Sequence, residues 1–277
     1  MKNNLGKIIT ALVTPFNKKN EINYSILKKL IEIQIDRKIK TILILGTTGE
    51  GSSLSFNEKK KVIKFVCDNF KDKINIMCNI GCNNTFDSLK LGLYAESCKV
   101  DYLLVVTPYY IKPNQNGLYE HYKFLNNNLN TPLFIYNIPY RTGVNIEYNT
   151  IFKLSKLNNI VGIKEANNEQ IDRLLFYLND FLIYSGNDYD YLNNLKKGIK
   201  GIISVSSNLI PDYLVIDDNF NEFHQSLFLD SNPLCIKYLL NKRGYDVGNA
   251  RMPLGYLDNE VCEKLDLIYE KYYKYFI

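Results

Sequence analysis

The amino-acid sequence predicts a (β/α)₈ barrel, an α/β fold of the TIM-barrel type, followed by a small C-terminal helical appendage. Short apolar runs rich in β-branched residues alternate with longer segments of helical periodicity through residues 1–205. These runs are apolar on both faces, as parallel strands covered by helices must be. Because there are eight of them and no Gly-x-Gly-x-x-Gly motif follows the first, a closed barrel is favoured over an open doubly wound sheet.

The elements follow one another with little interruption. The expected strands are Ile8–Val13, Thr41–Leu45, Ile74–Cys78, Tyr102–Val106, Leu133–Tyr136, Ile160–Lys164, Phe181–Ser185 and Gly201–Val205. The helical segments between them are Tyr24–Arg37, Asn57–Phe70, Thr85–Cys98, Leu118–Leu129, Ile146–Leu157, Gln170–Leu178 and Tyr189–Lys197. Ser55 and Glu58 have the spacing of a capping box, which predicts the start of the second helix.

The alternation of strands and helices ends after Val205. We therefore expect a catalytic barrel in residues 1–210 and a C-terminal helical region in residues 223–277. The clearest helices of that region are Pro233–Leu240 and Asp258–Tyr275.

Composition and charge argue against several classes of protein. The net charge of +5 is modest and the lysines are scattered, so we expect no nucleic-acid partner. The first residues lack the features of a signal peptide, and no run reaches the ~18 to 20 apolar residues of a membrane span. A cytoplasmic location without a membrane partner is expected. The six cysteines form no Cys-x-x-Cys pair and the histidines, His121 and His224, are isolated, so no metal site is expected.

The active sites of such barrels lie at the carboxyl ends of the strands, so the residues that follow each strand are the candidates for the site. After the second strand, Gly46-Thr47-Thr48-Gly49-Glu50-Gly51 can form a tight turn whose N–H groups and hydroxyls converge on a small carboxylate. Gly-Thr loops are also common as ordinary turns. Gly186 after the seventh strand and Ile203 in the eighth would add a close backbone approach and an apolar wall.

Tyrosines and an arginine follow the fourth and fifth strands. The fourth runs into Tyr110 and the fifth ends at Tyr136, although in a chain with 22 tyrosines many serve packing. Arg141 lies in the loop after Tyr136, and its planar guanidinium suits a carboxylate. The alternative for Arg141 is an ordinary surface residue.

Lys164 closes the apolar sixth strand. An ammonium group at an apolar barrel mouth loses solvation, so its pKa falls from ~10.4 toward neutrality and the free amine can attack a carbonyl. The alternative is a lysine at a strand end that points into solvent.

Five motifs together resemble the dihydrodipicolinate synthase family. They are GTTGE at 46–50, TPYY at 107–110, YNIPYRTG at 136–143, GIKEA at 162–166 and SGND at 185–188. This family belongs to the pyruvate-dependent Schiff-base aldolases, which include N-acetylneuraminate lyase. The resemblance runs from about Ile8 to about Asn208 and resumes over Phe228 to Leu257.

The resemblance implies a role for each catalytic position. Lys164 would form an imine with pyruvate, and Tyr136 would shuttle protons. Thr48 and Tyr110 would complete a proton relay with Tyr136, with Tyr110 reaching into the site of a neighbouring subunit. A homotetramer built as a dimer of dimers, or a homodimer, is therefore implied.

The resemblance also implies the substrates. The Thr47-Thr48 loop would hold the pyruvate carboxylate, with Gly186 and Ile203 near it, and Arg141 would bind L-aspartate 4-semialdehyde. Condensation of the two substrates would give 4-hydroxy-tetrahydrodipicolinate, at the entrance to lysine and diaminopimelate biosynthesis. Because the imine itself acts as the electron sink, no cofactor or metal is expected.

Two alternatives remain open from the sequence. A related aldolase that cleaves N-acetylneuraminate or a 2-keto-3-deoxy sugar acid would share Lys164 and Tyr136 but would not need Arg141. A non-catalytic homologue would only bind a small acid or a partner.

Two departures from the family pattern stand out. The regulatory lysine site of the family corresponds to Ser52, Phe56, Lys59, Asn83, Asp87 and Tyr109. Phe56 and Lys59 replace histidines common in sensitive members, and Lys59 adds a cation near a cationic effector, so weak or no lysine inhibition is predicted. The segment between Asn208 and Asn232 is also compressed, which predicts a shortened eighth helix at about 211–222.

Overall fold

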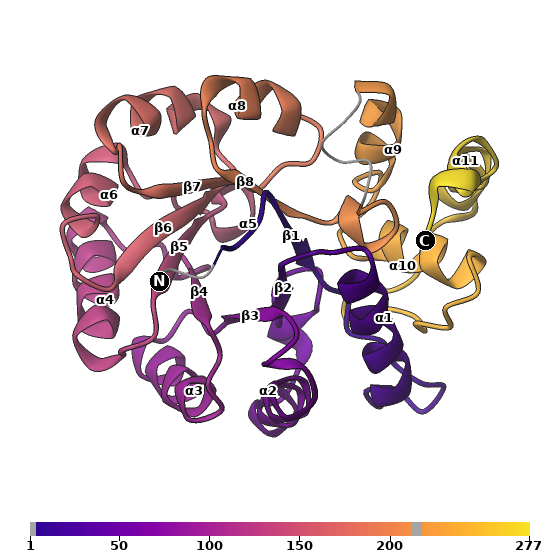
Figure 1. Cartoon of the computed structure of the whole chain (residues 1–277), viewed down its shortest axis with the longest axis horizontal. Coiled ribbons are helices and arrows are strands. Elements are labelled where there is room, and N and C mark those ends of the chain that lie inside the picture. Colours follow the sequence, from indigo (N-terminus) through magenta and orange to yellow (C-terminus); the bar gives the residue numbers. More distant parts are fainter. Residues whose placement is uncertain (1–3, 212–217) are drawn as a thin grey trace.

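Eight parallel strands close into a barrel in the computed structural model, which describes residues 4–211 and 218–277 (Figure 1). Each strand pairs with the next along the chain, and β1 pairs with β8 through Ile8 and Ile202, among other residues. The strands are β1 (Ile8–Ala11), β2 (Thr41–Ile44), β3 (Asn75–Asn79), β4 (Tyr102–Val106), β5 (Leu133–Asn137), β6 (Ile160–Glu165), β7 (Leu182–Ser185) and β8 (Gly201–Ser204). The predicted fold class is confirmed.

A ring of helices surrounds the barrel (Figure 1). They are α1 (Tyr24–Asp36), α2 (Phe56–Phe70), α3 (Thr85–Ser97), α4 (Gln115–Asn128), α6 (Tyr148–Leu154), α7 (Ile171–Tyr177) and α8 (Tyr191–Lys197). The predicted capping box of α2 forms, with the Glu58 N–H donating to the Ser55 hydroxyl. Helix α4 begins three residues earlier than predicted because the Asn114 side chain caps it.

One helix was not expected. The four-residue α5 (Pro139–Thr142) follows β5 directly, with Pro139 at its first position and Gly143 in a left-handed conformation at its end. Proline is suited to the first turn of a helix because its missing N–H would have no partner there. Helix α6 is in turn shorter than predicted, since the N–H of Ile146 donates to Asn137 and leaves this residue outside the helix.

Apolar side chains fill both the barrel and the layer between strands and helices. The interior contains Ile9, Leu43, Met77, Leu104 and Ile203, and aromatic rings from three strands meet there edge to face. Packing is so close that a Cβ atom at Gly162 would lie 2.4 Å from the Phe134 ring. The barrel is therefore a packed core whose open positions lie at the strand ends.

The C-terminal helices lie to one side of the barrel, beyond α1 (Figure 1). They are α9 (Asn221–Ser226), α10 (Leu234–Lys242) and α11 (Asn259–Tyr272). Half of the shortened eighth helix expected at about 211–222 falls on residues 212–217, which lie outside the described residues. Within the described residues between Asn208 and Asn232, the only α-helix is the six-residue α9. The division at residues 210 and 223 stays a prediction.

Helices α10 and α11 are joined by polar contacts as well as by packing. The Lys242 ammonium lies 2.7 Å from the Asp266 carboxylate, which also accepts from the Tyr238 hydroxyl.

No helix within residues 4–211 or 218–277 is both long enough and apolar enough to span a bilayer.

Candidate active site

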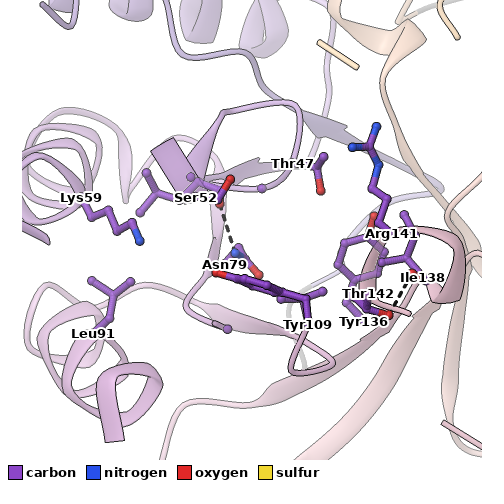
Figure 2. Close-up of a pocket in the computed structure, with 15 residues that line it drawn as sticks. Thr47, Ser52, Lys59, Asn79, Leu91, Tyr109, Tyr136, Ile138, Arg141 and Thr142 are labelled. Carbon is purple, nitrogen blue, oxygen red and sulfur yellow. Dashed lines mark hydrogen bonds between the residues drawn. The ribbon is translucent and has the colours of Figure 1, made fainter. Parts of the chain in front are cut away.

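A cavity of about 200 Å³ opens at the carboxyl ends of the strands (Figure 2). Thr47, Tyr136 and Arg141 lie along one part of it, and Lys59 and Leu91 lie at the opposite end. Thr47, Tyr136 and Arg141 meet here because the ends of parallel strands and the loops that follow them lie at the same edge of the barrel. Lys59 and Leu91 come from helices α2 and α3. The cavity is thus bordered by groups that can donate protons, bind anions or carry positive charge.

Lys164 is a buried lysine near the end of β6, only 5% exposed. Its ammonium nitrogen lies 4.4 Å from the centroid of the Tyr136 ring, on the neighbouring strand β5. Burial lowers the pKa of Lys164 to about 8, against the opposing effect of the Asp188 carboxylate. This is the direction expected from the sequence, and it increases the fraction of free amine near neutral pH.

The next residue, Glu165, faces the opposite side of β6 and is fully buried. Its carboxylate accepts hydrogen bonds from the Asn137 side chain at 2.9 Å, the Asn167 N–H at 2.7 Å and the Gln170 side chain at 2.9 Å. Burial raises the pKa of Glu165 to about 8. The hydrogen bond between Glu165 and Asn137 connects β6 to β5 beside Lys164. The sequence does contain a signal for Glu165, because an acidic residue at the end of an apolar strand is unusual, but it was not selected as a site residue.

Asp188 is a second residue that the sequence analysis did not select, although it lies in the SGND motif. It is buried, and its carboxylate accepts from the Ser204 hydroxyl and, at 3.0 Å, from the Val205 N–H. These bonds fix it at the end of β8. From there it is the main group that raises the pKa of Lys164.

Tyr136 is the last residue but one of β5 and is 4% exposed. Burial raises its pKa to about 12, although a hydrogen bond with the Thr47 side chain and the charge of Arg141 act in the opposite direction. The phenol is therefore neutral at physiological pH. A neutral phenol can donate a proton and accept one in turn.

The two threonines of the loop after β2 face different ways. Thr47 lines the cavity and hydrogen-bonds with Tyr136, whereas the Thr48 hydroxyl accepts from the Asn232 amide at 3.0 Å. The structure therefore pairs Thr47 with Tyr136, and the expected relay role of Thr48 stays a prediction. The reason is local: in a tight turn, successive side chains point in different directions.

Arg141 is exposed and lines the cavity from α5. Its guanidinium lies 5.6 Å from the Tyr140 ring, and its Nε donates to the Tyr140 hydroxyl at 3.4 Å. The short helix carries the guanidinium to the same part of the cavity as Tyr136 (Figure 2). Its outer N–H groups are suited to a carboxylate.

Gly186 and Ile203 lie where the sequence placed them, at the end of β7 and within β8. The Gly186 N–H donates to the Glu165 carbonyl at 2.7 Å, and an added Cβ would lie 2.9 Å from the Cβ of Ala166. Ile203 is fully buried in the same apolar cluster as Tyr136. Their contact with a substrate stays a prediction.

Tyr110 is not among the residues that line the cavity of its own chain. It is 88% exposed, with a left-handed backbone at φ 72° that is costly for a residue with a side chain. Its side chain therefore lies in solvent, outside the cavity. Within one chain, Tyr110 and Tyr136 are not brought together.

The residues that match a regulatory lysine site gather near the far end of the cavity. Ser52, Lys59 and Tyr109 line it, and the Tyr109 hydroxyl hydrogen-bonds with the backbone of Asn83. Phe56 lies on α2 with the Lys90 ammonium 4.9 Å from its ring, and Asp87 lies in the first turn of α3. This end of the cavity is therefore lined by one lysine cation, that of Lys59.

The described residues contain no group of three or more histidine, cysteine or acidic side chains that could hold a metal ion. The chemistry that these residues can perform rests on the Lys164 amine, the Tyr136 phenol and the Arg141 guanidinium. A (β/α)₈ barrel with a buried amine and a neutral phenol at neighbouring strand ends has the groups that Schiff-base enzymes such as carbon lyases use.

Comparison with known proteins identifies the family. The model of the dihydrodipicolinate synthetase family matches residues 4–271. The 4-hydroxy-tetrahydrodipicolinate synthase of Fervidobacterium nodosum is 39% identical over 282 residues, covering 95% of this chain and 96% of that protein. The 4-hydroxy-tetrahydrodipicolinate synthase 1 of Clostridium acetobutylicum is 40% identical over 270 residues, covering 90% and 92%.

The structural comparison agrees. The crystal structure of dihydrodipicolinate synthase from Aquifex aeolicus superposes with a TM-score of 0.92 at 34% identity, covering 97% of this chain and 98% of that one. The chain belongs to the dihydrodipicolinate synthetase family.

Proposed function

We propose that the chain is a 4-hydroxy-tetrahydrodipicolinate synthase, which condenses pyruvate with L-aspartate 4-semialdehyde through an imine on Lys164. The observation that carries the proposal is the buried Lys164, with a pKa of about 8, beside the neutral phenol of Tyr136. Relatives that share 39–40% identity over nearly the whole chain are named for this activity.

The reaction begins when the Lys164 amine adds to the ketone carbon of pyruvate and water leaves. The positive imine nitrogen draws electrons, so the pyruvate methyl group loses a proton and becomes an enamine carbon nucleophile. This carbon attacks the aldehyde carbon of the semialdehyde, and the aldehyde oxygen takes up a proton. The amino group of the second substrate then attacks the imine carbon, which closes the ring and releases the lysine.

Tyr136 is the proton carrier in this proposal. Its phenol is close to Lys164, and its hydrogen bond with Thr47 gives the proton a second oxygen to move to. Thr47 therefore takes part in the relay, and the role that the sequence assigns to Thr48 stays a prediction. Tyr110 would complete the relay from a neighbouring chain, since its exposed side chain lies outside the cavity of its own chain.

The proposed relay requires an oligomer, because Tyr110 would have to enter the active site of a second chain. A homodimer is the smallest assembly that can place this phenol in a second active site, and a homotetramer would be a pair of such dimers. The reaction needs no external cofactor, and we place it in the cytoplasm.

Arg141 distinguishes this activity from that of a sugar-acid aldolase. Its guanidinium lies in the cavity near Tyr136, where the carboxylate of the semialdehyde would need a cationic partner. Thr47 and Thr48 would hold the carboxylate of pyruvate.

The proposal is tested by supplying purified protein with pyruvate and aspartate semialdehyde, beside a parallel assay of N-acetylneuraminate cleavage. We expect pyruvate to be consumed only when the semialdehyde is present. Cleavage of the sugar acid without semialdehyde-dependent consumption would contradict the proposal and assign the chain to the related aldolases.

A further inference from the structure

A buried ion pair connects the active-site loop to the C-terminal helices. The Lys237 ammonium of α10 lies 2.5 Å from the Glu50 carboxylate, and the two side chains are 2% and 0% exposed. Glu50 belongs to the turn that follows β2, two residues after Thr48. Although burial lowers the pKa of Lys237 to about 8, the Glu50 carboxylate opposes this change. The Lys237 ammonium therefore stays mainly charged at neutral pH.

Arg251, in the segment between α10 and α11, strengthens the same connection. Its backbone N–H donates to the second Glu50 oxygen at 2.7 Å, while its guanidinium lies 2.7 Å from Glu58. The Lys237 ammonium and the Arg251 guanidinium lie 4.2 Å and 4.3 Å from the centroid of the Phe16 ring. Both oxygens of the Glu50 carboxylate are thus held by the C-terminal region.

A second link reaches the threonine itself. The Asn232 amide, just before α10, donates to the Thr48 hydroxyl at 3.0 Å, and both residues are buried. A hydroxyl that accepts this bond keeps its own proton free to donate elsewhere. Asn232 therefore sets the direction in which Thr48 can donate.

The turn has little freedom of its own to move. Glu50 adopts a left-handed backbone at φ 52°, and the next residue must be glycine because a Cβ at Gly51 would lie 2.0 Å from the Leu45 carbonyl oxygen. The N–H groups of Glu50 and Gly51 close the turn on the carbonyls of Thr47 and Gly46, at 3.0 Å and 3.1 Å. A displacement of Glu50 would therefore displace the threonines.

We propose that Glu50, Lys237 and Asn232 are positioning residues, which hold the Thr47-Thr48 turn in the geometry that binds the carboxylate of pyruvate. This inference rests on the proposed function, in which that turn receives the carboxylate. It gives the C-terminal helices a direct part in pyruvate binding, although they contribute no side chain to the cavity among the described residues.

The nature of the contacts supports positioning over simple packing. Burying a lysine and a glutamate costs desolvation energy, and an apolar pair of similar volume often stabilises a protein equally well. What an ion pair adds is a fixed direction, because the charges are satisfied in one arrangement only. Here that arrangement fixes one turn, and the turn carries two threonines at the mouth of the barrel.

Two variants test the proposal by different routes. Asn232→Ala removes the donor to Thr48 without removing a charge, and the double variant Glu50→Gln with Lys237→Met removes the ion pair without leaving a buried charge alone. Lys242→Met is the matched control, because it breaks an ion pair of the same helix that faces α11. Each protein is incubated with a series of pyruvate concentrations, reduced with cyanoborohydride, and weighed by mass spectrometry.

In both test variants, we expect the pyruvate concentration that gives half-maximal adduct to rise about three- to tenfold, as for the loss of one hydrogen bond. The KM for semialdehyde at saturating pyruvate should stay within twofold, and Lys242→Met should match the wild type. A role in stability alone would lower the thermal midpoint or the amount of active enzyme without moving pyruvate saturation.

The proposal would be overturned if folded Asn232→Ala reached half-maximal adduct at a pyruvate concentration within twofold of that for the wild type. It would also be overturned if Lys242→Met showed the same rise in that concentration as the test variants. Since Asn232→Ala changes no charge, it decides the outcome if the double variant does not fold. If the wild type itself forms no pyruvate adduct, the proposed function fails and this inference fails with it. An adduct on the wild type with unshifted variants would remove this inference alone.

Discussion

Changing the pH tests the consequence of burying Lys164. Burial brings its pKa down to about 8, so the free amine becomes more abundant as the pH rises and reaches one half near pH 8. At pH 7 roughly one molecule in ten carries the free amine, against roughly one in 2,500 for a lysine with the ordinary pKa of ~10.4. The burial of this residue therefore raises the fraction of free amine about 200-fold.

The expected profile follows from the same pKa. Between pH 6 and pH 8 the free-amine fraction rises from about 1% to about 50%, and above pH 8 it can at most double. The initial rate of imine formation with saturating pyruvate should therefore rise about 50-fold over this interval and then level off.

The rate is measured by stopping the reaction at short times with cyanoborohydride and weighing the pyruvate adduct by mass spectrometry. Lys164→Ala is the control and should form no adduct at any pH. A rate that continues to rise about tenfold for each pH unit through pH 9 to 10 would refute the reasoning, because it would show a solvated lysine with an ordinary pKa.

Four further outcomes are expected. Tyr136→Phe should lower kcat by ~10² to 10⁴, the usual contribution of a proton-transferring group, and a smaller loss in steady-state assays would remove its role as carrier. Arg141→Ala should raise the KM for semialdehyde ~10- to 100-fold with the KM for pyruvate unchanged; an equal rise for both would point to general disruption. Submillimolar lysine should inhibit the wild type weakly or not at all, because the Lys59 cation lines the end of the cavity that matches the regulatory lysine site. Lys59→Ala should increase inhibition by lysine. A normal inhibition curve for the wild type would contradict this prediction. Gly162→Ala should lower the free energy of unfolding by ~1 to 3 kcal/mol in denaturant titrations, because its Cβ would overlap Phe134; an unchanged value would argue against that close contact.

Most of the fold could be predicted because a barrel repeats one pattern. All eight predicted strands are present, with ends shifted by at most two residues, since each apolar run has few ways to be buried on both faces. The four-residue α5 was missed because a single helical turn leaves no periodicity to detect. Asn114 and Asn137 moved the starts of α4 and α6 through side-chain bonds that a pattern of apolar residues does not contain.

The candidate site was predictable to the level of strand ends but not of side-chain directions. The sequence placed Lys164 and Tyr136 at neighbouring strand ends. In the barrel, the Lys164 ammonium nitrogen lies 4.4 Å from the centroid of the Tyr136 ring. Which threonine meets Tyr136 depends on the backbone of a six-residue turn, and the structure pairs Thr47 with it. The pairing of Glu50 with Lys237 could not be seen, because it joins segments far apart in the chain and no local pattern marks it.

The measurement that tests the central claim most directly is semialdehyde-dependent consumption of pyruvate by the wild type and by Lys164→Ala, with the reduced adduct located by peptide mass spectrometry. We predict consumption by the wild type, none by the variant, and a pyruvate-derived mass on the peptide that contains Lys164. Turnover that survives in Lys164→Ala, or an adduct on another lysine, would contradict the account.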